Sequence, residues 1–314
     1  MLVKNKPLIL VTRKSALAIW QAEYVKKKIL MHDKSLTIDI HAIQTSGDVF
    51  FKTSLSKIGG KGLFIKELEQ YILTGKANFA VHSMKDVPAE LPEGLAITCM
   101  LERKNPTDAL LSKKYCKLED LPSNAVVGTS SLRRKAQLLA LRSDLEIQPL
   151  RGNINTRVQK LHNGEFHAIV LASAGIERLG LTGIDINQFE IDSMLPAVGQ
   201  GALGVECRVN DHFIHGLLSE LNHKSIWQCV CAEREMNRLL NGGCQAPIGG
   251  FARITESGQL ELRGLVATPD GKQLLKSTNS GEPKNFKLIG QFVGQNLIEQ
   301  GAMEIMDVLR CEDN

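Results

Sequence analysis

Residues 125–134 read Ala-Val-Val-Gly-Thr-Ser-Ser-Leu-Arg-Arg: a short apolar strand pattern, three hydroxyl side chains, and the start of a basic helix pattern. The same order recurs at 147–161, where Arg151-Gly-Asn153 forms the turn, and again from 168, where Ala172–Gly175 forms it. Strand patterns that alternate with helix patterns predict a mostly parallel sheet with helices on both faces. These three repeats therefore predict an α/β fold for the middle of the chain.

The first third of the chain shows the same alternation, and the last third does not. After a Gly-rich segment at 192–204, helix and strand patterns follow one another without alternating, which predicts a separate small α+β domain with a three-stranded sheet. The predicted strands of the first third lie at 8–11, 36–42 and 79–81, with helices at 15–30 and 63–72. In the last third a helix at 225–240 precedes strands at 248–254, 260–267 and 273–278 and a helix at 286–300.

Arginine is concentrated in the middle third, although the net charge of the chain is only +4. The guanidinium group offers paired donors that fit carboxylates and phosphates. Each predicted turn also brings small or hydroxyl residues to a helix N-terminus, where free amides favour anions. Because only 5% of the residues are aromatic and none form a stacking stripe, we expect a small polyanion rather than nucleic acid. The arginines are Arg133, Arg134, Arg142, Arg151, Arg157 and Arg178.

The cysteines predict a reducing environment. Seven cysteines at irregular spacing, with neither a secretory signal nor an apolar run long enough for a membrane helix, predict free thiols and a cytoplasmic protein without membrane contact. Cys229 and Cys231 have one residue between them, which is poor spacing for zinc, so we interpret them as packing residues and expect no metal site.

Two segments could carry chemistry. In Val81-His-Ser-Met-Lys-Asp-Val-Pro88 a strand ends at Lys85 and Asp86, where a carboxylate can act as acid, base or electrostatic stabiliser, or simply form a surface ion pair. His82 is given no role, because such histidines are usually core or turn residues. In Asn241–Gly250, glycine pairs flank Cys244, which favours either a thiol presented for bond formation or a small hydrophobe in a tight turn.

Several motifs, in this order, resemble the hydroxymethylbilane synthase (porphobilinogen deaminase) family over essentially the whole chain. They are Thr12–Ala18, Gly60–Phe64, Val81–Pro88, Gly128–Arg134, Arg151–Arg157, Pro196–Gly201 and Gly242–Pro247. The resemblance implies two doubly wound lobes like those of periplasmic binding proteins and a third, smaller domain. With the patterns above, it places domain 1 at 1–100 plus 200–218, domain 2 at 101–199 and domain 3 at 219–314.

The resemblance also implies an activity, a substrate and a cofactor. The family is a transferase of tetrapyrrole and haem biosynthesis that joins four porphobilinogen molecules head to tail, releases ammonia at each step, and hydrolyses off the linear tetrapyrrole. Its primer is a dipyrromethane held by a thioether to the cysteine that matches Cys244, and Asp86 matches its catalytic residue. We expect a monomer. Ser46 stands where the family commonly has a basic residue, which puts one contact of the nearby loop in doubt.

By motif match, a set of polar residues is expected to bind the carboxylates of cofactor and substrate: Arg13, Ser15, Ser83, Lys85, Thr129, Ser130, Ser131, Arg133, Arg134, Arg151, Asn153, Arg157, Arg178 and Gln200. The Gly-rich and basic stretch with Lys57, Lys61 and Phe64 is interpreted as a lid loop rather than a Walker A motif. Arg133 and Arg151 are expected on cleft turns, where substitution would impair function more than stability.

Two other classes of function fit part of the pattern. A non-catalytic, two-lobed anion-binding protein would also use paired lobes and arginines, but it would release no ammonia from porphobilinogen. A thiol hydrolase would use Cys244 as nucleophile, but no histidine is obviously paired with it in the sequence.

Overall fold

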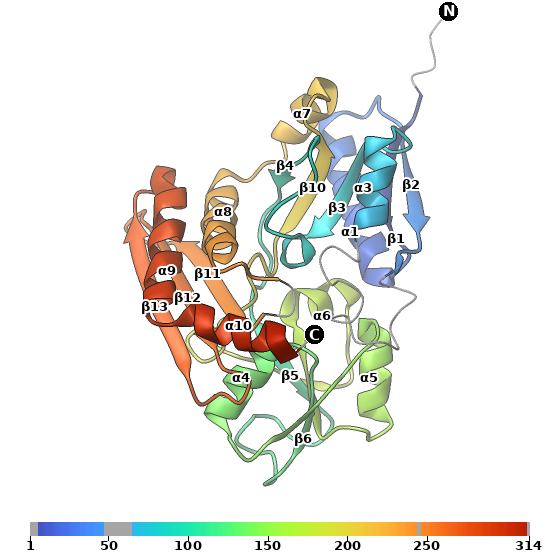
Figure 1. Cartoon of the computed structure of the whole chain (residues 1–314). Helices are drawn as coiled ribbons and strands as arrows, with labels where there is room; N and C mark the ends of the chain where they lie inside the picture. The colour runs from blue at the N-terminus through green and yellow to red at the C-terminus, as the bar shows by residue number, and fades with distance from the viewer. Residues whose placement is uncertain (1–5, 47–64, 244–245, 313–314) are drawn as a thin grey trace, which may run out of the picture.

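The computed structural model describes residues 6–46, 65–243 and 246–312. These residues form three units, each built around its own sheet, with the third unit against the other two (Figure 1). The first two sheets have five strands each, and the third has three. The predicted α/β architecture with a C-terminal α+β unit is thereby confirmed.

The first sheet has the strand order β2-β1-β3-β10-β4. Strand β1 pairs parallel with β2 and β3, whereas β10 runs antiparallel to β3 and β4. Side chains alternate across the sheet: Phe79 and Val81 pack in the core on the α1 side, and Ala80 packs with α3 on the other. The elements are β1 (Leu8–Arg13), α1 (Ala16–His32), β2 (Ile38–Ile43), α3 (Lys66–Leu73), β3 (Phe79–Ser83), β4 (Leu95–Met100), β10 (Leu203–Arg208) and α7 (His212–Ser219).

The second sheet has the corresponding order β7-β6-β8-β5-β9, with β5 antiparallel to both of its neighbours. Helix α4 packs on one face through Leu138, and α5 and α6 pack on the other through Leu161 and Ile176. The elements are β5 (Asp108–Ser112), β6 (Val126–Gly128), α4 (Leu132–Leu141), β7 (Glu146–Gln148), α5 (Ile154–His162), β8 (Ala168–Ala172), α6 (Ser173–Leu179) and β9 (Asp185–Gln188).

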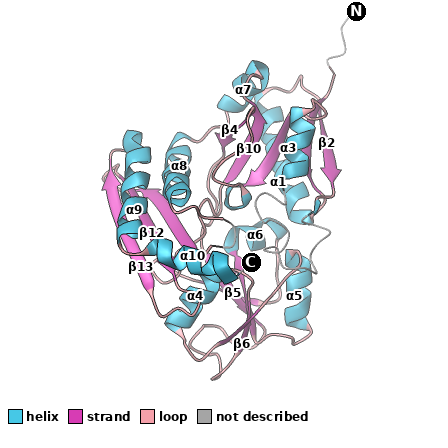
Figure 2. Ribbon diagram, in the orientation of Figure 1, coloured by secondary structure: helices cyan, strands magenta, loops and turns pink. Residues whose placement is uncertain are grey.

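The third sheet is antiparallel, and α8, α9 and α10 share one core with it (Figure 2). Leu260 and Leu262 of its central strand face these helices, while Leu265 and Ala267 pack against Ala136 of α4. The third unit therefore contacts the second through the opposite face of its sheet. The elements are α8 (Lys224–Leu239), β11 (Ile248–Ile254), β12 (Leu260–Ala267), β13 (Leu274–Gly281), α9 (Phe286–Glu299) and α10 (Ala302–Glu312).

The structure refines the sequence analysis in three places. Both large sheets are mixed rather than mostly parallel, because β10 and β5 each run against their neighbours. The strands β4, β5 and β9 were not predicted, and α10 follows the helix predicted to be the last. Because β10 returns to the first sheet after the second is complete, the strand order supports the domain boundaries given above, which remain our proposal.

Two segments of the chain connect the first and second units. One contains Lys104 and the other contains Gly201, and the two segments are in contact at Gly201. This glycine has φ +88°, and a Cβ added there would lie 2.3 Å from the carbonyl oxygen of Lys104 on the other segment. At Gly199 (φ +72°) an added Cβ would lie 2.8 Å from Cβ of Met84, in the short 3₁₀ turn Met84–Asp86 that follows β3. Only glycine allows both the positive φ and these close approaches. The crossing segment at Gly199 is therefore packed tightly against the turn that carries Asp86.

Candidate functional site

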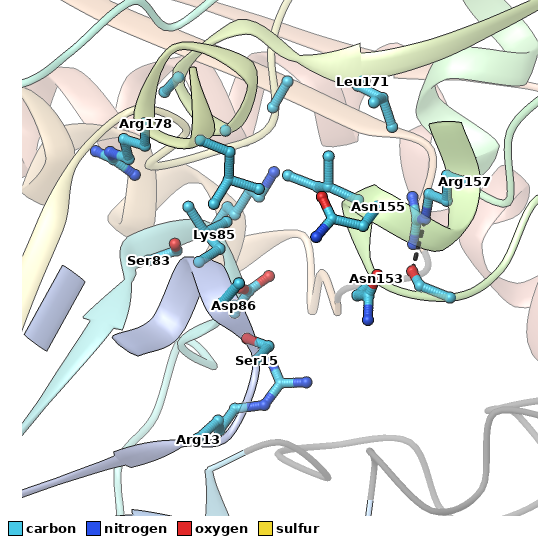
Figure 3. A pocket seen from close by; sticks show the side chains of 18 of the residues that line it. Arg13, Ser15, Ser83, Lys85, Asp86, Asn153, Asn155, Arg157, Leu171 and Arg178 are labelled. Atoms are coloured by element: carbon cyan, nitrogen blue, oxygen red, sulfur yellow. Dashed lines mark hydrogen bonds between the residues drawn. The ribbon is translucent and has the colours of Figure 1, made fainter. Parts of the chain in front are cut away.

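A cavity of about 530 Å³ lies between the first two units. Its lining carries six cationic side chains, and Asp86 is the one carboxylate among the described residues that line it. Figure 3 shows Asp86 between Lys85 and Ser15 in this view, with Asn153 and Arg157 reaching the cavity from the second unit. Ten of the predicted binding or catalytic residues line it: Arg13, Ser15, Ser83, Lys85, Asp86, Arg134, Asn153, Arg157, Arg178 and Gln200.

Three helices, α1, α5 and α6, begin at this cavity, and a side chain caps each of the first two. Ser15 is the N-cap of α1, and its hydroxyl oxygen accepts a hydrogen bond from Ala18 N at 3.3 Å. Asn153 caps α5 in the same way, with its side-chain oxygen 2.9 Å from Thr156 N. These side chains fix the helix starts, whose remaining amides and dipoles add positive potential to the cavity. The predicted link between strand ends, helix starts and anion binding thus has a geometric basis here.

The cationic groups of the cavity have lost much of their hydration. Removal from water lowers the pKa of Lys85 to about 8, against the opposing charge of Asp86. The same effect, with neighbouring Arg134, lowers the pKa of Arg157 to about 10, and desolvation lowers the pKa of Arg178 to about 10. Desolvated cations gain most from an anion placed beside them, so the cavity is electrostatically prepared for acidic groups.

Arg133 and Arg134 share a buried carboxylate that the sequence analysis missed. Asp108, fully buried at the start of β5, lies 2.8 Å from Nη1 of Arg133 and 2.7 Å from Nη2 of Arg134. Burial alone would raise the pKa of Asp108, but the two guanidinium groups outweigh it and hold the pKa well below its usual range. Both arginines are themselves buried, so Arg133, which was expected on a cleft turn together with Arg151, also holds a buried ion pair.

Gln200 connects this buried cluster to Lys85. Its Nε2 donates to Asp108 Oδ1 at 3.0 Å and to the carbonyl oxygen of Pro106 at 2.7 Å. Its Oε1 accepts from Nζ of Lys85 at 3.4 Å. Because the amide hydrogens are already used, Gln200 orients Lys85 rather than offering a donor to an anion.

A smaller cavity of about 70 Å³ lies beside Lys85, on the side of the third unit. Lys85, Ser131 and Arg133 line it together with Gly243 and Ala246. The last two are the described neighbours of residues 244–245 in the sequence, and Cys244 itself lies outside the described residues.

The other predicted residues are not at either cavity. Thr129 is buried and its Oγ1 accepts from Ser131 N, whereas the Ser130 hydroxyl donates to Leu150 O at 3.0 Å. Both therefore shape the turn before α4. Arg151 is half-buried and is not part of the lining of these two cavities. Lys57, Lys61 and Phe64 lie outside the described residues, while Ser46 is hydrogen-bonded to the Glu67 carboxylate.

Helix α8 holds two segments in place near Asp86, namely Val87–Pro88 and the backbone at Gly199. The residues that do this were not singled out in the sequence. Arg234 donates to the carbonyl oxygens of Val87 at 3.0 Å and Pro88 at 2.7 Å, directly after Asp86. The buried Glu233 accepts from Gly199 N at 2.6 Å and from Arg103 at 2.5 Å. In the sequence, Glu233 and Arg234 are typical of the solvent-exposed face of a helix. Their role becomes visible only once the third unit is packed against the other two.

The described residues contain neither a metal-binding cluster nor a helix that could span a membrane. No group of three or more His, Cys, Asp or Glu side chains is arranged to hold a metal ion in the part of the chain that the structure describes. Within the same ranges, no helix has the length and apolar character needed to cross a membrane.

Family models match most of the chain. Residues 8–216 match the model described as "Porphobilinogen deaminase, dipyromethane cofactor binding domain", and residues 227–299 match "Porphobilinogen deaminase, C-terminal domain". The two matches follow each other in the order of the three structural units. The first covers both cavity-forming sheets, and the second covers most of the third unit.

The matches to solved structures are weaker. The periplasmic VFT2 domain of BvgS from Bordetella pertussis has a TM-score of 0.41 and 12% identity, covering 68% of this chain and 86% of that one. CbnR, a LysR family transcriptional regulator, has a TM-score of 0.42 and 11% identity, covering 68% and 67%. YhfZ from Shigella flexneri has a TM-score of 0.36 and 15% identity, covering 74% and 95%.

Proposed function

Because the chain belongs to the porphobilinogen deaminase family, we propose that its cationic cavity binds the acidic pyrroles of a dipyrromethane primer and of the growing chain, with Asp86 as the catalytic carboxylate. The enzyme is a transferase of tetrapyrrole biosynthesis that acts on porphobilinogen with a dipyrromethane cofactor. The observation that carries the proposal for the site is the single carboxylate of Asp86 among six cations in the lining described above.

The residues of the cavity fit this cofactor and substrate. Each pyrrole unit carries an acetate and a propionate, so a lengthening chain brings many carboxylates into one site. The side chains of Arg13, Arg157 and Arg178 match this demand, since guanidinium groups bind carboxylates through paired, charge-assisted hydrogen bonds. In addition, Nε of Arg178 is buried without a hydrogen-bond acceptor among the described residues, as expected of a donor that awaits an anion.

The cofactor is proposed to be attached through a thioether to Cys244. Support comes from the smaller cavity, where Gly243 and Ala246 stand beside Lys85 and Arg133. When bound, the dipyrromethane supplies the free pyrrole carbon to which each new unit is joined. Cys244 is then an anchor, and its bond persists from one cycle to the next.

Asp86 has two tasks in this proposal. Loss of ammonia from porphobilinogen leaves a cationic azafulvene, and a carboxylate held beside it stabilises that charge. The same carboxylate accepts a proton when the pyrrole ring recovers its aromaticity. Lys85, oriented by Gln200, holds a substrate carboxylate next to Asp86 and so aligns the reacting carbon with it.

The family assignment sets aside the two alternatives from the sequence, an anion-binding protein without catalysis and a thiol hydrolase. We further propose a cytoplasmic monomer. Free thiols are found at Cys99, Cys116, Cys207, Cys229 and Cys231, which supports a reducing compartment. Light scattering of the purified enzyme tests the monomeric state.

Intact-mass spectrometry tests the attachment. The wild-type protein should exceed the sequence mass by a two-pyrrole adduct, Cys244→Ser should lack the adduct, and Cys116→Ser, at an exposed free thiol, should retain it. An adduct that survives in Cys244→Ser, or a fully active enzyme without any adduct, would contradict the proposal.

A further inference from the structure

Three titratable side chains meet in the interior of the first unit, where the mechanism above does not use them. His82 of β3 is 4% exposed, Glu206 of β10 is 0% exposed, and Glu69 of α3 is 5% exposed. Burying two carboxylates and an imidazole together is costly unless they share protons or hydrogen bonds. Their presence in this core therefore requires an explanation.

The strand register brings His82 and Glu206 together. On β3, His82 points to the same face as Ala80, which is the face covered by α3. Glu206 is paired with Ala80 across the sheet, and Nε2 of His82 lies 2.9 Å from Oε2 of Glu206. At this distance the buried imidazole and the carboxylate are joined by a hydrogen bond.

Glu69 is placed against this pair from α3. Its Oε1, and Oε1 of Glu206, are buried and have no hydrogen-bond partner among the described residues. Burial, followed by the charge of Glu206, raises the pKa of Glu69 to about 7, while His82 and Lys66 oppose the rise. Other charged groups on the surrounding elements are Glu67 on α3, Arg13 at the end of β1, Arg208 on β10, which pairs with Asp211, and Arg234 on α8.

The cluster opens toward Asp86. A cavity of about 60 Å³ is lined by His82, Ser83 and Asp86, with Arg13 at the same wall. This volume is sufficient for ordered water, and the cavity has polar groups to bind it. Asp86 and His82 therefore line one space that can hold water between them.

The reaction produces a proton at this place. The aminomethyl group of porphobilinogen is an ammonium at neutral pH. When its C–N bond breaks, the electron pair leaves with nitrogen as neutral ammonia. The new C–C bond then replaces a C–H bond of the acceptor pyrrole, and that hydrogen leaves as a proton to the Asp86 carboxylate. Each condensation thus leaves Asp86 with one proton to dispose of before the next.

We propose that His82, Glu206 and Glu69 form a proton acceptor for Asp86, to which the proton passes through the cavity that His82 and Asp86 share. The proton resides on the side chains of this cluster and returns through the same cavity to solvent before the next condensation. The inference rests on the proposed role of Asp86. His82, Glu206 and Glu69 are not catalytic residues in this proposal, since they touch neither substrate nor cofactor. They act through Asp86, as positioning residues that receive its proton.

The decisive variant is Glu69→Gln, because a glutamine keeps the shape of the protonated side chain and takes up no proton. In the cofactor-loaded enzyme, kcat between pH 7 and 8 should fall by roughly tenfold, with KM unchanged and a larger solvent deuterium isotope effect. The matched control is Ile72→Val, which loosens the packing of the same helix without changing a titratable group and should leave both quantities unchanged.

A second measurement needs no variant. Infrared titration of the wild-type enzyme should show a buried carboxylic acid band that disappears near pH 7. Absence of that band, or wild-type turnover in Glu69→Gln across pH 6–9, would overturn the inference. Loss of turnover in Asp86→Asn beside normal turnover in Glu69→Gln would refute this inference alone, whereas normal turnover in Asp86→Asn would refute the role of Asp86 itself.

Discussion

Two groups of arginines in this enzyme have opposite environments. Arg133 and Arg134, in the first turn of α4, are buried and paired with the fully buried Asp108. Arg157 and Arg178 are half-buried at the large cavity, where Nε of Arg157 donates to Gly152 O and an Arg178 Nη2 donates to Gly201 O. The first pair has its counter-charge within the protein. The second pair has only carbonyl oxygens among its described hydrogen-bond acceptors.

The difference in environment separates two roles of arginine, stabilising the fold and binding a ligand, that the sequence alone does not distinguish. An arginine with a buried carboxylate partner holds the fold, because removing either charge leaves the other uncompensated. An arginine that faces a cavity contributes its charge to a ligand. Arg134 belongs to both groups, since it is paired with Asp108 and also lines the cavity.

The largest effect should come from the buried pair. Asp108→Asn keeps the shape of the side chain but leaves two buried guanidinium groups without their counter-charge. We expect the free energy of unfolding to fall by about 3–5 kcal/mol. Urea denaturation followed by circular dichroism measures this.

Asp144→Asn is the matched control, because Asp144 pairs with Arg142 at the surface. That variant should leave the urea midpoint nearly unchanged. If Asp108→Asn were as stable as this control, Arg133 and Arg134 would not be structural residues.

An intermediate effect is expected at the cavity. Arg157→Leu removes a cation that no carboxylate of the described residues pairs with, so stability should change little. Loss of one charge-assisted hydrogen bond of about 1.5–3 kcal/mol should raise KM for porphobilinogen roughly 10- to 100-fold. Steady-state kinetics tests this, with the exposed Arg253→Leu as control. A folded Arg157→Leu variant with a normal KM and a free energy of unfolding lowered by several kcal/mol would reverse the comparison.

The smallest effect is a pH dependence at Lys85. Its pKa of about 8 lies below the ordinary value, so the ammonium loses its proton as pH rises through 8 and attraction for substrate carboxylates fades. We expect kcat/KM to fall by roughly three- to tenfold between pH 8 and 9.5 in the wild type. The arginine of Lys85→Arg keeps its charge over this range, so kcat/KM of that variant should fall less. Identical profiles would exclude Lys85 as the titrating group.

Much of the fold and of the site could be predicted from the sequence. The repeated strand–turn–helix pattern around Thr129, Asn153 and Ala172 predicts the second unit, and Asp86 lies at the end of a predicted strand that ends at the cavity. Local patterns are sufficient here because the ends of neighbouring strands and the starts of helices meet at one edge of a sheet.

What the sequence could not show depends on pairing between distant segments. Nothing next to Asp108 indicates that it meets Arg133, and nothing next to His82 indicates Glu206, 124 residues further along the chain. Strands β10 and β5 return antiparallel from other parts of the chain, and they bring these acidic residues to their positions. For this reason the sequence shows neither the buried ion pair of Arg133 nor the buried hydrogen bond of His82.

Ammonia release by Asp86→Asn tests the central claim most directly, namely that one carboxylate in a cationic cavity carries out each condensation. With the cofactor adduct verified by mass and the fold verified by circular dichroism, turnover at saturating porphobilinogen should fall by roughly 10²- to 10⁴-fold while the thermal midpoint is kept. Ammonia release within a few-fold of the wild type would contradict the account.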